Sequence, residues 1–245
     1  MQLDLNADLG EGMGDDAAML ALVTSANVAC GGHASDPDLM LHTLRLAQAR
    51  GVVVGAHPGY ADRTNFGRVV IPMEPAQIAA LVAAQIGALQ GVAGLCGARV
   101  AYVKAHGALA NLAADQRSVA DAVALAAKAA GLALLAISGT ELQAAGEAAG
   151  IPTYAEIFAD RAYLASGRLV PRGHPQAMIH DPQTALERLI TFLETGLMPV
   201  IDGPAIRLAA HSVCIHGDSP EAVAMAQTLR AGLARRGVTL APFLQ

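Results

Sequence analysis

The chain has 245 residues, of which 53% are hydrophobic and 3% are aromatic, and its net charge at pH 7 is −5. A protein that binds nucleic acid needs clustered lysine and arginine to neutralise phosphates. Here there are 16 such residues and only two of them are lysines, Lys104 and Lys128. We therefore expect no nucleic-acid partner and favour small-molecule chemistry. One α/β barrel takes about 250 residues, so we predict a single domain over residues 1–245.

The cysteine usage and the apolar stretches favour a soluble protein of a reduced, cytoplasmic compartment. The first residues have neither the basic nor the apolar stretch of a signal peptide. The apolar stretch Val119–Ile137 is interrupted by Lys128 and Gly131, so we interpret it as a helix followed by a buried strand, and expect no membrane span. The three cysteines are odd in number and stand at no metal-ligand spacing: Cys30, Cys96 and Cys214.

Short runs of aliphatic and β-branched residues recur along the chain and predict strands. Continuous apolar runs of this kind are typical of parallel strands that are covered on both faces. In chain order the predicted strands are Leu3–Leu9, Asn27–Cys30, Val52–Ala56, Val100–Ala105, Leu132–Ile137, Thr153–Phe158 and Ser212–Ile215, with Thr239–Pro242 as a candidate eighth.

Helical patterns separate the predicted strands. Asp36-Pro37 and Asp181-Pro182 each place a capping residue before a proline at the first helical position, and Gly51 and Gly196 stand just past the matching ends. Alternating strands and helices predict parallel βαβ units. Seven or eight such units predict a closed or nearly closed (β/α) barrel, with an open doubly wound sheet as the alternative. Residues 161–180 form the longest irregular stretch, which we expect to be a lid or a partner surface.

Polar and ionisable residues follow nearly every predicted strand. In parallel α/β folds the active site lies at the carboxyl ends of the strands, so these residues are candidates for the site. Some of them could instead cap helices or bind loop amides. The candidates are Asn6, Asp8, His33, His57, Lys104, His106, Glu156, Asp160, Arg161, His216 and Asp218.

Lys104 is the most informative single residue. It lies in an otherwise apolar strand, and lysine is almost never fully buried unless it is paired. Strand alternation puts Lys104 and His106 on the same face. If that face is the barrel interior, both point at the substrate, and Lys104 could hold an anion or stabilise an oxyanion. A lysine that reaches solvent is the alternative.

Histidines are candidate general acids and bases because imidazole titrates near neutral pH. Together with Asp8, His33 and His57 could instead bind a divalent metal with an open position for a hydrolase reaction. No compact metalloprotease motif is present in the sequence.

Two arginine-containing segments could hold an anionic group. Asp62, Arg63 and Arg68 surround the turn at residues 65–67 and could clamp an anion, and Arg161 is a second candidate. A solvated turn and a simple Asp160–Arg161 ion pair are the alternatives.

Three well-known motifs are absent from the sequence. There is no P-loop, no G-x-G-x-x-G dinucleotide fingerprint and no G-x-S-x-G nucleophile elbow. Use of ATP by this chain alone would therefore need a binding site of another kind.

Taken together, the segments at the strand ends resemble the LamB/YcsF family. They occur in order from the first strand to the last helix, so the resemblance covers almost the whole chain. The chain departs from the family pattern at Val69, where a second arginine is usual, and at Ala105, where proline is usual. The matching segments are residues 4–11, 26–37, 55–60, 66–68, 103–109, 156–163 and 214–218.

The resemblance implies a barrel related to those of polysaccharide deacetylases and of family 38 and 57 glycosidases. It also implies cleavage of 5-oxoproline to glutamate, coupled to ATP hydrolysis, together with B and C subunits. Because the P-loop is missing, we expect ATP to bind at least partly on one of these partners. The alternatives are a stand-alone metal-dependent hydrolase or deacetylase, and a non-catalytic subunit that binds a metabolite.

Within the expected reaction the strand-end residues take two kinds of role. We predict as catalytic residues Lys104, His106, Asp8, His57, Glu156 and Asp218. We predict as substrate-binding residues Asn6, His33, Arg68, Asp160, Arg161 and His216. A divalent metal, if one is used, is expected on Asp8, His33 and His57.

Overall fold

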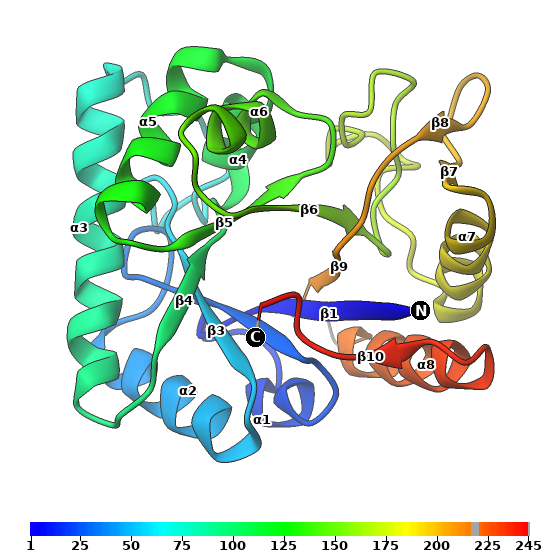
Figure 1. The fold of residues 1–245 in the computed structure, drawn as a ribbon, viewed down its shortest axis with the longest axis horizontal. Helices are drawn as coiled ribbons and strands as arrows, with labels where there is room; N and C mark the ends of the chain where they lie inside the picture. The colour runs from blue at the N-terminus through cyan, green and yellow to red at the C-terminus, as the bar shows by residue number, and fades with distance from the viewer. Residues whose placement is uncertain (217–220, 245) are drawn as a thin grey trace.

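Seven parallel strands form a closed barrel in the computed structural model, which describes residues 1–216 and 221–244 (Figure 1). The ring closes because β1 pairs with β9, from Asp4 beside Ser212 to Asp8 beside His216. That closure decides for the barrel and against the open sheet. The strands in order around the ring are β1 (Gln2–Leu9), β2 (Ser25–Ala29), β3 (Val53–His57), β4 (Val100–Val103), β5 (Ala133–Ile137), β6 (Thr153–Phe158) and β9 (Ser212–His216).

The candidate eighth strand does not enter the ring. β10 (Thr239–Leu240) is a two-residue strand that pairs with Gln2 and Leu3 at the start of β1. Since the rest of β1 already pairs with β2 and β9, β10 extends the sheet at its amino-terminal edge and lines no part of the site.

Helices surround the strands on the outside of the barrel (Figure 1). Two of them begin and end as the capping signals predict: Asp36 and Asp181 accept hydrogen bonds from the first turns, and Gly51 and Gly196 adopt the left-handed conformation at the ends. The helices are α1 (Asp16–Leu20), α2 (Pro37–Arg50), α3 (Pro75–Gly94), α4 (Gly107–Asp115), α5 (Arg117–Ala129), α6 (Glu141–Ala148), α7 (Pro182–Thr195) and α8 (Ala222–Arg235).

Two apolar segments of the chain contribute to the helix layer, and one of them also contributes a strand to the barrel. The stretch Val119–Ile137 forms most of α5 and all of β5, as predicted. In the described part of the chain, α3 has the length and hydropathy of a membrane-spanning helix. One face of α3, carrying Ile78, Val82 and Ile86, is buried in the core of the protein. That face is what a helix covering the barrel requires.

The irregular stretch after β6 folds over the carboxyl ends of the strands. It contains only two isolated bridges, Arg161 with Met178 and Tyr163 with Leu169. Val170 and Ala177 are fully buried, so the segment is packed down rather than free. It is followed by α7 and by the short antiparallel pair β7 (Leu197–Met198) and β8 (Ile206–Arg207).

Candidate active site

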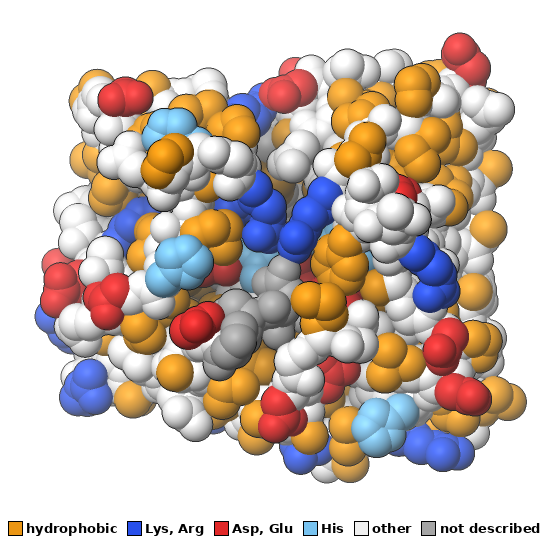
Figure 2. All heavy atoms as spheres, turned by 180° about the vertical axis from the view of Figure 1, so that it is seen from behind, with side chains coloured by type: hydrophobic (Ala, Val, Ile, Leu, Met, Phe, Trp, Pro, Cys, Tyr) orange, Lys and Arg blue, Asp and Glu red, His pale blue; other side chains and the backbone are white. Residues whose placement is uncertain are grey.

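A cavity of about 540 Å³ opens at the carboxyl ends of the strands. On the face opposite to that of Figure 1, lysine and arginine side chains gather around a hollow (Figure 2). The volume falls in the range of small-molecule sites. Its polar and charged lining residues include Asp8, His57, Arg68, Lys104, His106, Glu156, Arg161, Arg168, Arg172 and His216.

At the base of the cavity, Lys104 lies between two carboxylates. Its Nζ is 2.9 Å from Asp8 Oδ1 and 2.8 Å from Glu156 Oε1, and it also contacts Cys214 Sγ at 3.1 Å. Lys104 is 4% exposed, so the alternative of a lysine that reaches solvent is wrong. The two carboxylates explain how a lysine can be buried in this strand, because a buried ammonium group needs opposite charge.

Burial and charge act on the two carboxylates in different proportions. Burial raises the pKa of Asp8, but the charges of His57 and Lys104 outweigh it and hold that pKa well below its usual value. Burial also raises the pKa of Glu156, and here the opposing charge of Lys104 is not sufficient, so this pKa stays above its usual value. Burial lowers the pKa of Lys104, but Asp8, Cys214 and Glu156 together raise it well above normal. Glu156 is thus the more basic of the two carboxylates.

Amide side chains below the cavity hold this charged group in place. Asn6 Nδ2 donates to Glu156 Oε1 at 2.8 Å, and Asn27 Nδ2 donates to Asp8 Oδ1 at 2.8 Å. Tyr102 Oη donates in turn to Asn27 Oδ1 at 2.7 Å. Asn6, which is predicted to bind substrate, is fully buried behind Glu156 and lies outside the cavity lining.

Three histidines and one glutamate form a second group beside the first. His33 stacks on His106 with ring centroids 3.6 Å apart, and His33 Nε2 lies 2.9 Å from Glu11 Oε1. His57 Nε2 lies 3.0 Å from His106 Nδ1 and 3.4 Å from Asp8 Oδ2. Burial, together with the other histidines, lowers the pKa of His33 to about 3 and also lowers that of His106. This buried cluster could hold a metal ion.

The turn at residues 65–67 presses against the histidines. Phe66 has a φ of 56°, a conformation that a bulky side chain rarely adopts, and its carbonyl accepts from His106 Nε2 at 2.9 Å. Gly67 follows with a φ of 62°, and a Cβ there would lie 2.7 Å from His33 Cβ. The close approach of this turn therefore requires glycine at position 67.

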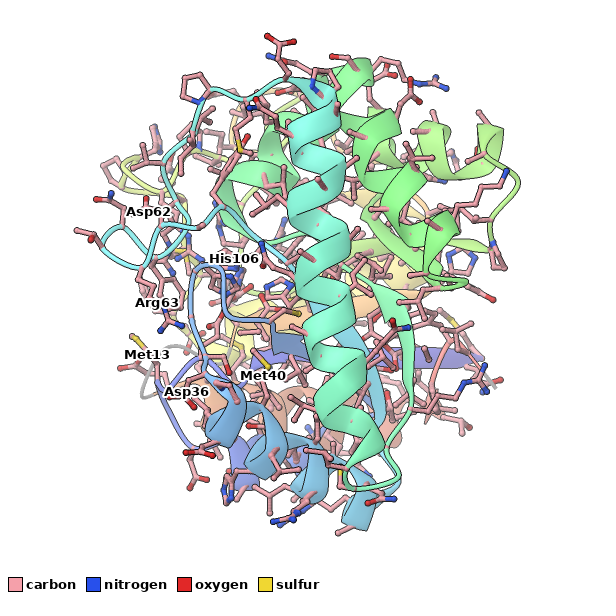
Figure 3. All side chains as sticks on the ribbon, turned by 90° about the vertical axis from the view of Figure 1, so that its left-hand side faces the viewer. Met13, Asp36, Met40, Asp62, Arg63 and His106 are labelled. Carbon is pink, nitrogen blue, oxygen red and sulfur yellow. The ribbon has the colours of Figure 1, made fainter. Side chains whose placement is uncertain are left out.

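The neighbouring residues Asp62 and Arg63 do not form the predicted anion clamp. Asp62 accepts from Asn65, and Arg63 donates to the carbonyl oxygen of Ser35. Figure 3 shows Arg63 pointing toward the start of α2, away from His106. Both residues therefore order the loops, and only Arg68 of this segment reaches the cavity, with its guanidinium 4.9 Å above the Phe66 ring.

On the other side of the cavity, His216 pairs with Asp160. His216 Nδ1 is 2.8 Å from Asp160 Oδ2, and the same oxygen accepts from the His216 backbone. Burial lowers the pKa of His216, but the charge and hydrogen bond of Asp160 outweigh it and raise the pKa above its usual value. His216 lines the cavity, whereas Asp160 does not. Asp160 thus orients His216 and raises its pKa, and among the described residues it pairs with His216 and not with Arg161.

Arg161 reaches the cavity from the irregular segment. Its guanidinium donates to the carbonyl oxygens of Ala177, at 3.3 Å, and Val170, at 2.7 Å. Burial and the nearby Arg172 lower its pKa to about 10, so it stays charged at neutral pH. Carbonyl oxygens carry no full negative charge, so Arg161 can still attract an anion in the cavity.

The structure thus brings most of the predicted site residues to one end of the barrel. His33 lies in the histidine cluster and lines no part of the cavity, and Asp218 lies outside the described residues. The predictions missed Glu11, Asn27 and Cys214. All three lie in the strand-end segments, and Glu11 follows Asp8 by only three residues, so its position was the available signal.

Comparison with known proteins places the chain in a family. The sequence profile of the LamB/YcsF family matches residues 3–245. A relative from Rhodopseudomonas palustris (strain BisA53), named as the A subunit of 5-oxoprolinase, is 50% identical over 98% of each chain. The crystal structure of a lactam utilization protein from Thermus thermophilus has a TM-score of 0.92 and 40% identity, over 98% of this chain and 99% of that one.

A more distant structure bears on the fold alone. The T48 deacetylase, solved with substrate, has a TM-score of 0.50 and 13% identity, over 98% of this chain and 87% of that one. This likeness agrees with the deacetylase-type barrel that the sequence predicts. The full-length match of the sequence profile and the identity of the relatives show more than the fold: this chain belongs to the LamB/YcsF family.

Proposed function

We propose that this chain is the A subunit of an ATP-dependent 5-oxoprolinase and that its cavity is where the lactam ring is opened. The observation that carries the proposal is that a carboxylate with a raised pKa, Glu156, and an imidazole paired with a carboxylate, His216, line the same cavity. The names of the full-length relatives support 5-oxoproline as the substrate, and the resemblance to the family implies the need for ATP.

The cavity offers complementary surfaces to 5-oxoproline. Phe158, Ile137 and Leu135 supply an apolar wall for the ring methylenes, and Arg161 and Arg68 supply positive charge for the carboxylate. An arginine is suited to a carboxylate because its planar fork can donate two parallel hydrogen bonds.

ATP is needed because a lactam is a poor electrophile. Transfer of the γ-phosphoryl group of ATP to the lactam oxygen gives an activated ring carbon and ADP. Since the sequence contains no P-loop, we place the nucleotide at least partly on the B and C subunits. The arginines at the mouth of the cavity, Arg68, Arg168 and Arg172, would meet the phosphorylated ring there.

Ring opening then needs one base and one acid. Glu156 takes a proton from water as the water oxygen bonds to the ring carbon. His216, whose pKa is raised by Asp160, donates a proton to the ring nitrogen as the C–N bond breaks. The acyl phosphate that results reacts with a second water to give glutamate and phosphate. Lys104 helps to hold the pKa of Asp8 low, opposes the effect of burial on the pKa of Glu156, and offers positive charge to the developing oxyanion.

The proposal is tested by replacing the acid. We expect His216→Gln to lower ATP-dependent glutamate release, by the complex reconstituted with B and C subunits, by about 100-fold or more. The matched control is His42→Gln, because His42 is exposed on α2. An unfolding curve for each variant separates loss of chemistry from loss of fold. Near-normal turnover in His216→Gln rules out the role of the imidazole.

A second variant tests the charge of His216. Its charged neighbours are Asp160, Asp8 and Arg172, and Asp160 has the largest effect in raising its pKa. An acid acts only while it is protonated, so activity falls as pH rises through this pKa. Asp160→Asn removes the charge that raises the pKa, and the high-pH limb of kcat/KM should therefore move to lower pH. An unmoved limb contradicts the assignment.

The histidine and glutamate cluster favours a second candidate, a metal-dependent hydrolase that acts without partners. The two functions differ in one measurement. A stand-alone hydrolase releases glutamate from 5-oxoproline, or acetate from an acetylated substrate, with the isolated chain and no ATP. A chain that works only within a complex does neither.

A further inference from the structure

Four potential metal ligands come from the ends of four successive strands. Glu11 follows β1, His33 follows β2, His57 ends β3 and His106 follows β4. One ligand atom from each lies within 4.8 Å of all the others, and all four side chains are buried. The mechanism proposed above uses none of these side chains in proton transfer.

The outer nitrogens of two histidines are fixed by carbonyl groups. His57 Nδ1 lies 2.8 Å from Lys104 O, and His106 Nε2 lies 2.9 Å from Phe66 O. A carbonyl oxygen only accepts, so each of these nitrogens carries the hydrogen. Histidines that bind metals commonly donate their other nitrogen to such an acceptor, which fixes the ring and its tautomer.

The inner nitrogens of the same two rings then face each other as lone pairs. In a neutral imidazole only one nitrogen carries a hydrogen. When both rings are neutral, His57 Nε2 and His106 Nδ1 are therefore both acceptors, although they lie only 3.0 Å apart. Two lone pairs at that distance repel each other. A proton on His57 Nε2, the charged form that lowers the pKa of Asp8, is one way to relieve this contact, and a shared cation is the other.

The spacing of the ligand atoms suits a small tetrahedral ion. Bonds of 2.0–2.1 Å at tetrahedral angles put neighbouring ligand atoms about 3.3 Å apart. Glu11 Oε1 lies 2.9 Å from His33 Nε2 and 3.6 Å from His106 Nδ1, on either side of that value. Among the described residues, His33 Nδ1 has no hydrogen-bond partner, so nothing outside the cluster fixes the tautomer of His33.

Asp8 is less suited than Glu11 to the fourth position. Asp8 Oδ1 already receives hydrogen bonds from Lys104, at 2.9 Å, and Asn27, at 2.8 Å. Asp8 Oδ2 is 3.4 Å from His57 Nε2, so it lies at the edge of the cluster. The ligand set of Asp8, His33 and His57 that the sequence suggests is therefore revised to one that contains Glu11 and His106.

We propose that Glu11, His33, His57 and His106 bind one divalent cation, and that Zn²⁺ is the ion they fit. Three imidazoles and one carboxylate are ligands of the kind that zinc prefers at four-coordinate sites. Because His57 and His106 also line the cavity, the ion lies in the wall of the lactam site. The inference goes beyond the proposed function and does not depend on it.

The test measures metal binding by the isolated chain, without ATP, partners or activity. The chain is stripped with a chelator, dialysed and titrated with Zn²⁺ in competition with a chromophoric chelator. We expect one ion per chain, and we expect Co²⁺ at the same site to give the intense visible bands of a tetrahedral complex. Failure to bind either ion overturns the proposal. It would leave a proton between His57 and His106 as the way in which their repulsion is relieved.

Variants identify the ligands. Glu11→Gln and His106→Gln should each weaken Zn²⁺ binding by more than about 100-fold, because loss of an outer partner alone costs roughly 10–100-fold. His42→Gln, at an exposed histidine on α2, is the matched control and should bind as the parent does. Thermal unfolding without metal checks that each variant folds. Zn²⁺ should raise the Tm of the parent and of the control only. Unchanged binding in both ligand variants assigns the ion elsewhere and overturns the proposal.

Discussion

Strand β1 carries two buried aspartates into the barrel, four residues apart, and they are stabilised in opposite ways. Asp4 accepts hydrogen bonds from the hydroxyls of Thr24, Ser25 and Ser212. Burial outweighs these bonds and raises its pKa to about 6. Asp8 is paired with Lys104, and its pKa is held well below its usual value. Hydroxyl groups can thus satisfy a buried carboxylate without making it acidic, whereas the combined positive charge of His57 and Lys104 makes Asp8 more acidic than usual despite its burial.

The difference separates two levels of the barrel interior. The lower level, around Asp4, is structural, and the upper level, around Asp8, Lys104 and Glu156, is reactive. Asn6 lies between the two aspartates on the same face of β1 and donates to both Ser212 and Glu156. The level of Asp4 is closed to the cavity, and Asp8 and Glu156 line it. Lys104 is therefore what distinguishes the charged upper level, which lines the cavity, from the lower level, where neutral hydroxyl groups bind the carboxylate.

The largest expected effect comes from removing that cation. Lys104→Met leaves Asp8 and Glu156 buried without their partner, and losing one member of a buried pair costs about 3–5 kcal/mol of unfolding free energy. Lys128→Met is the control, because Lys128 is exposed and donates to the carbonyl oxygen of Ala149. Urea unfolding at pH 7 measures both. Equal stability of the two variants shows that the upper level does not depend on Lys104.

At the lower level, Asp4 is expected to make the free energy of unfolding depend on pH. The folded pKa of Asp4 is about 6 and its ordinary value is 3.8, so the stability that this group contributes is lost as pH rises from about 4 to about 6. The shift corresponds to about 3 kcal/mol. Asp4→Asn cannot titrate, so its unfolding free energy relative to the parent should rise by about that amount between pH 4 and pH 7.

Urea unfolding of both proteins at several pH values checks this expectation. Asp202→Asn is the control, because Asp202 is exposed. A difference between Asp4→Asn and the parent that does not change with pH means that Asp4 is not shifted. The hydroxyls would then stabilise the anion as well as Lys104 stabilises Asp8.

Much of this arrangement could be predicted from the sequence. Continuous apolar runs are a strong signal for strands in a parallel barrel, and each strand of the ring begins and ends within about two residues of its predicted bounds. The agreement is poorest for β2, which is predicted at Asn27–Cys30 and begins at Ser25. The number of strands predicts a closed or nearly closed barrel, but it could not show that β1 and β9 make the closing pair, because pairing between strands that are distant in the chain leaves no local pattern.

The sequence predicts which residues form the site better than it predicts what each of them does. Lys104, Asp8 and Glu156 are all candidates from the sequence because each stands at a strand end. The sequence could not show that Lys104 lies between the two carboxylates, nor that carbonyl groups fix the outer nitrogens of His57 and His106. Those roles depend on neighbours that come from other strands, so they follow only from the three-dimensional structure.

The smallest expected effect on stability comes from a variant that separates catalysis from folding. Glu156→Gln keeps the shape of the side chain and leaves Lys104 paired with Asp8, one positive charge with one negative charge. We expect the unfolding free energy to fall by less than it does in Lys104→Met, because no buried charge is left without a partner. The same variant should lower glutamate release by the reconstituted complex by about 100-fold to 10,000-fold, the usual contribution of a general base.

Glu187→Gln is the matched control, because Glu187 is an exposed glutamate on α7. Three results are informative when both variants are measured by urea unfolding and by glutamate release. Loss of activity with retained stability supports Glu156 as the base. Loss of both shows that the second carboxylate is needed to balance Lys104, which makes the upper level structural like the lower one. Retention of both removes Glu156 from the mechanism, and the base must then be sought among the other residues of the cavity.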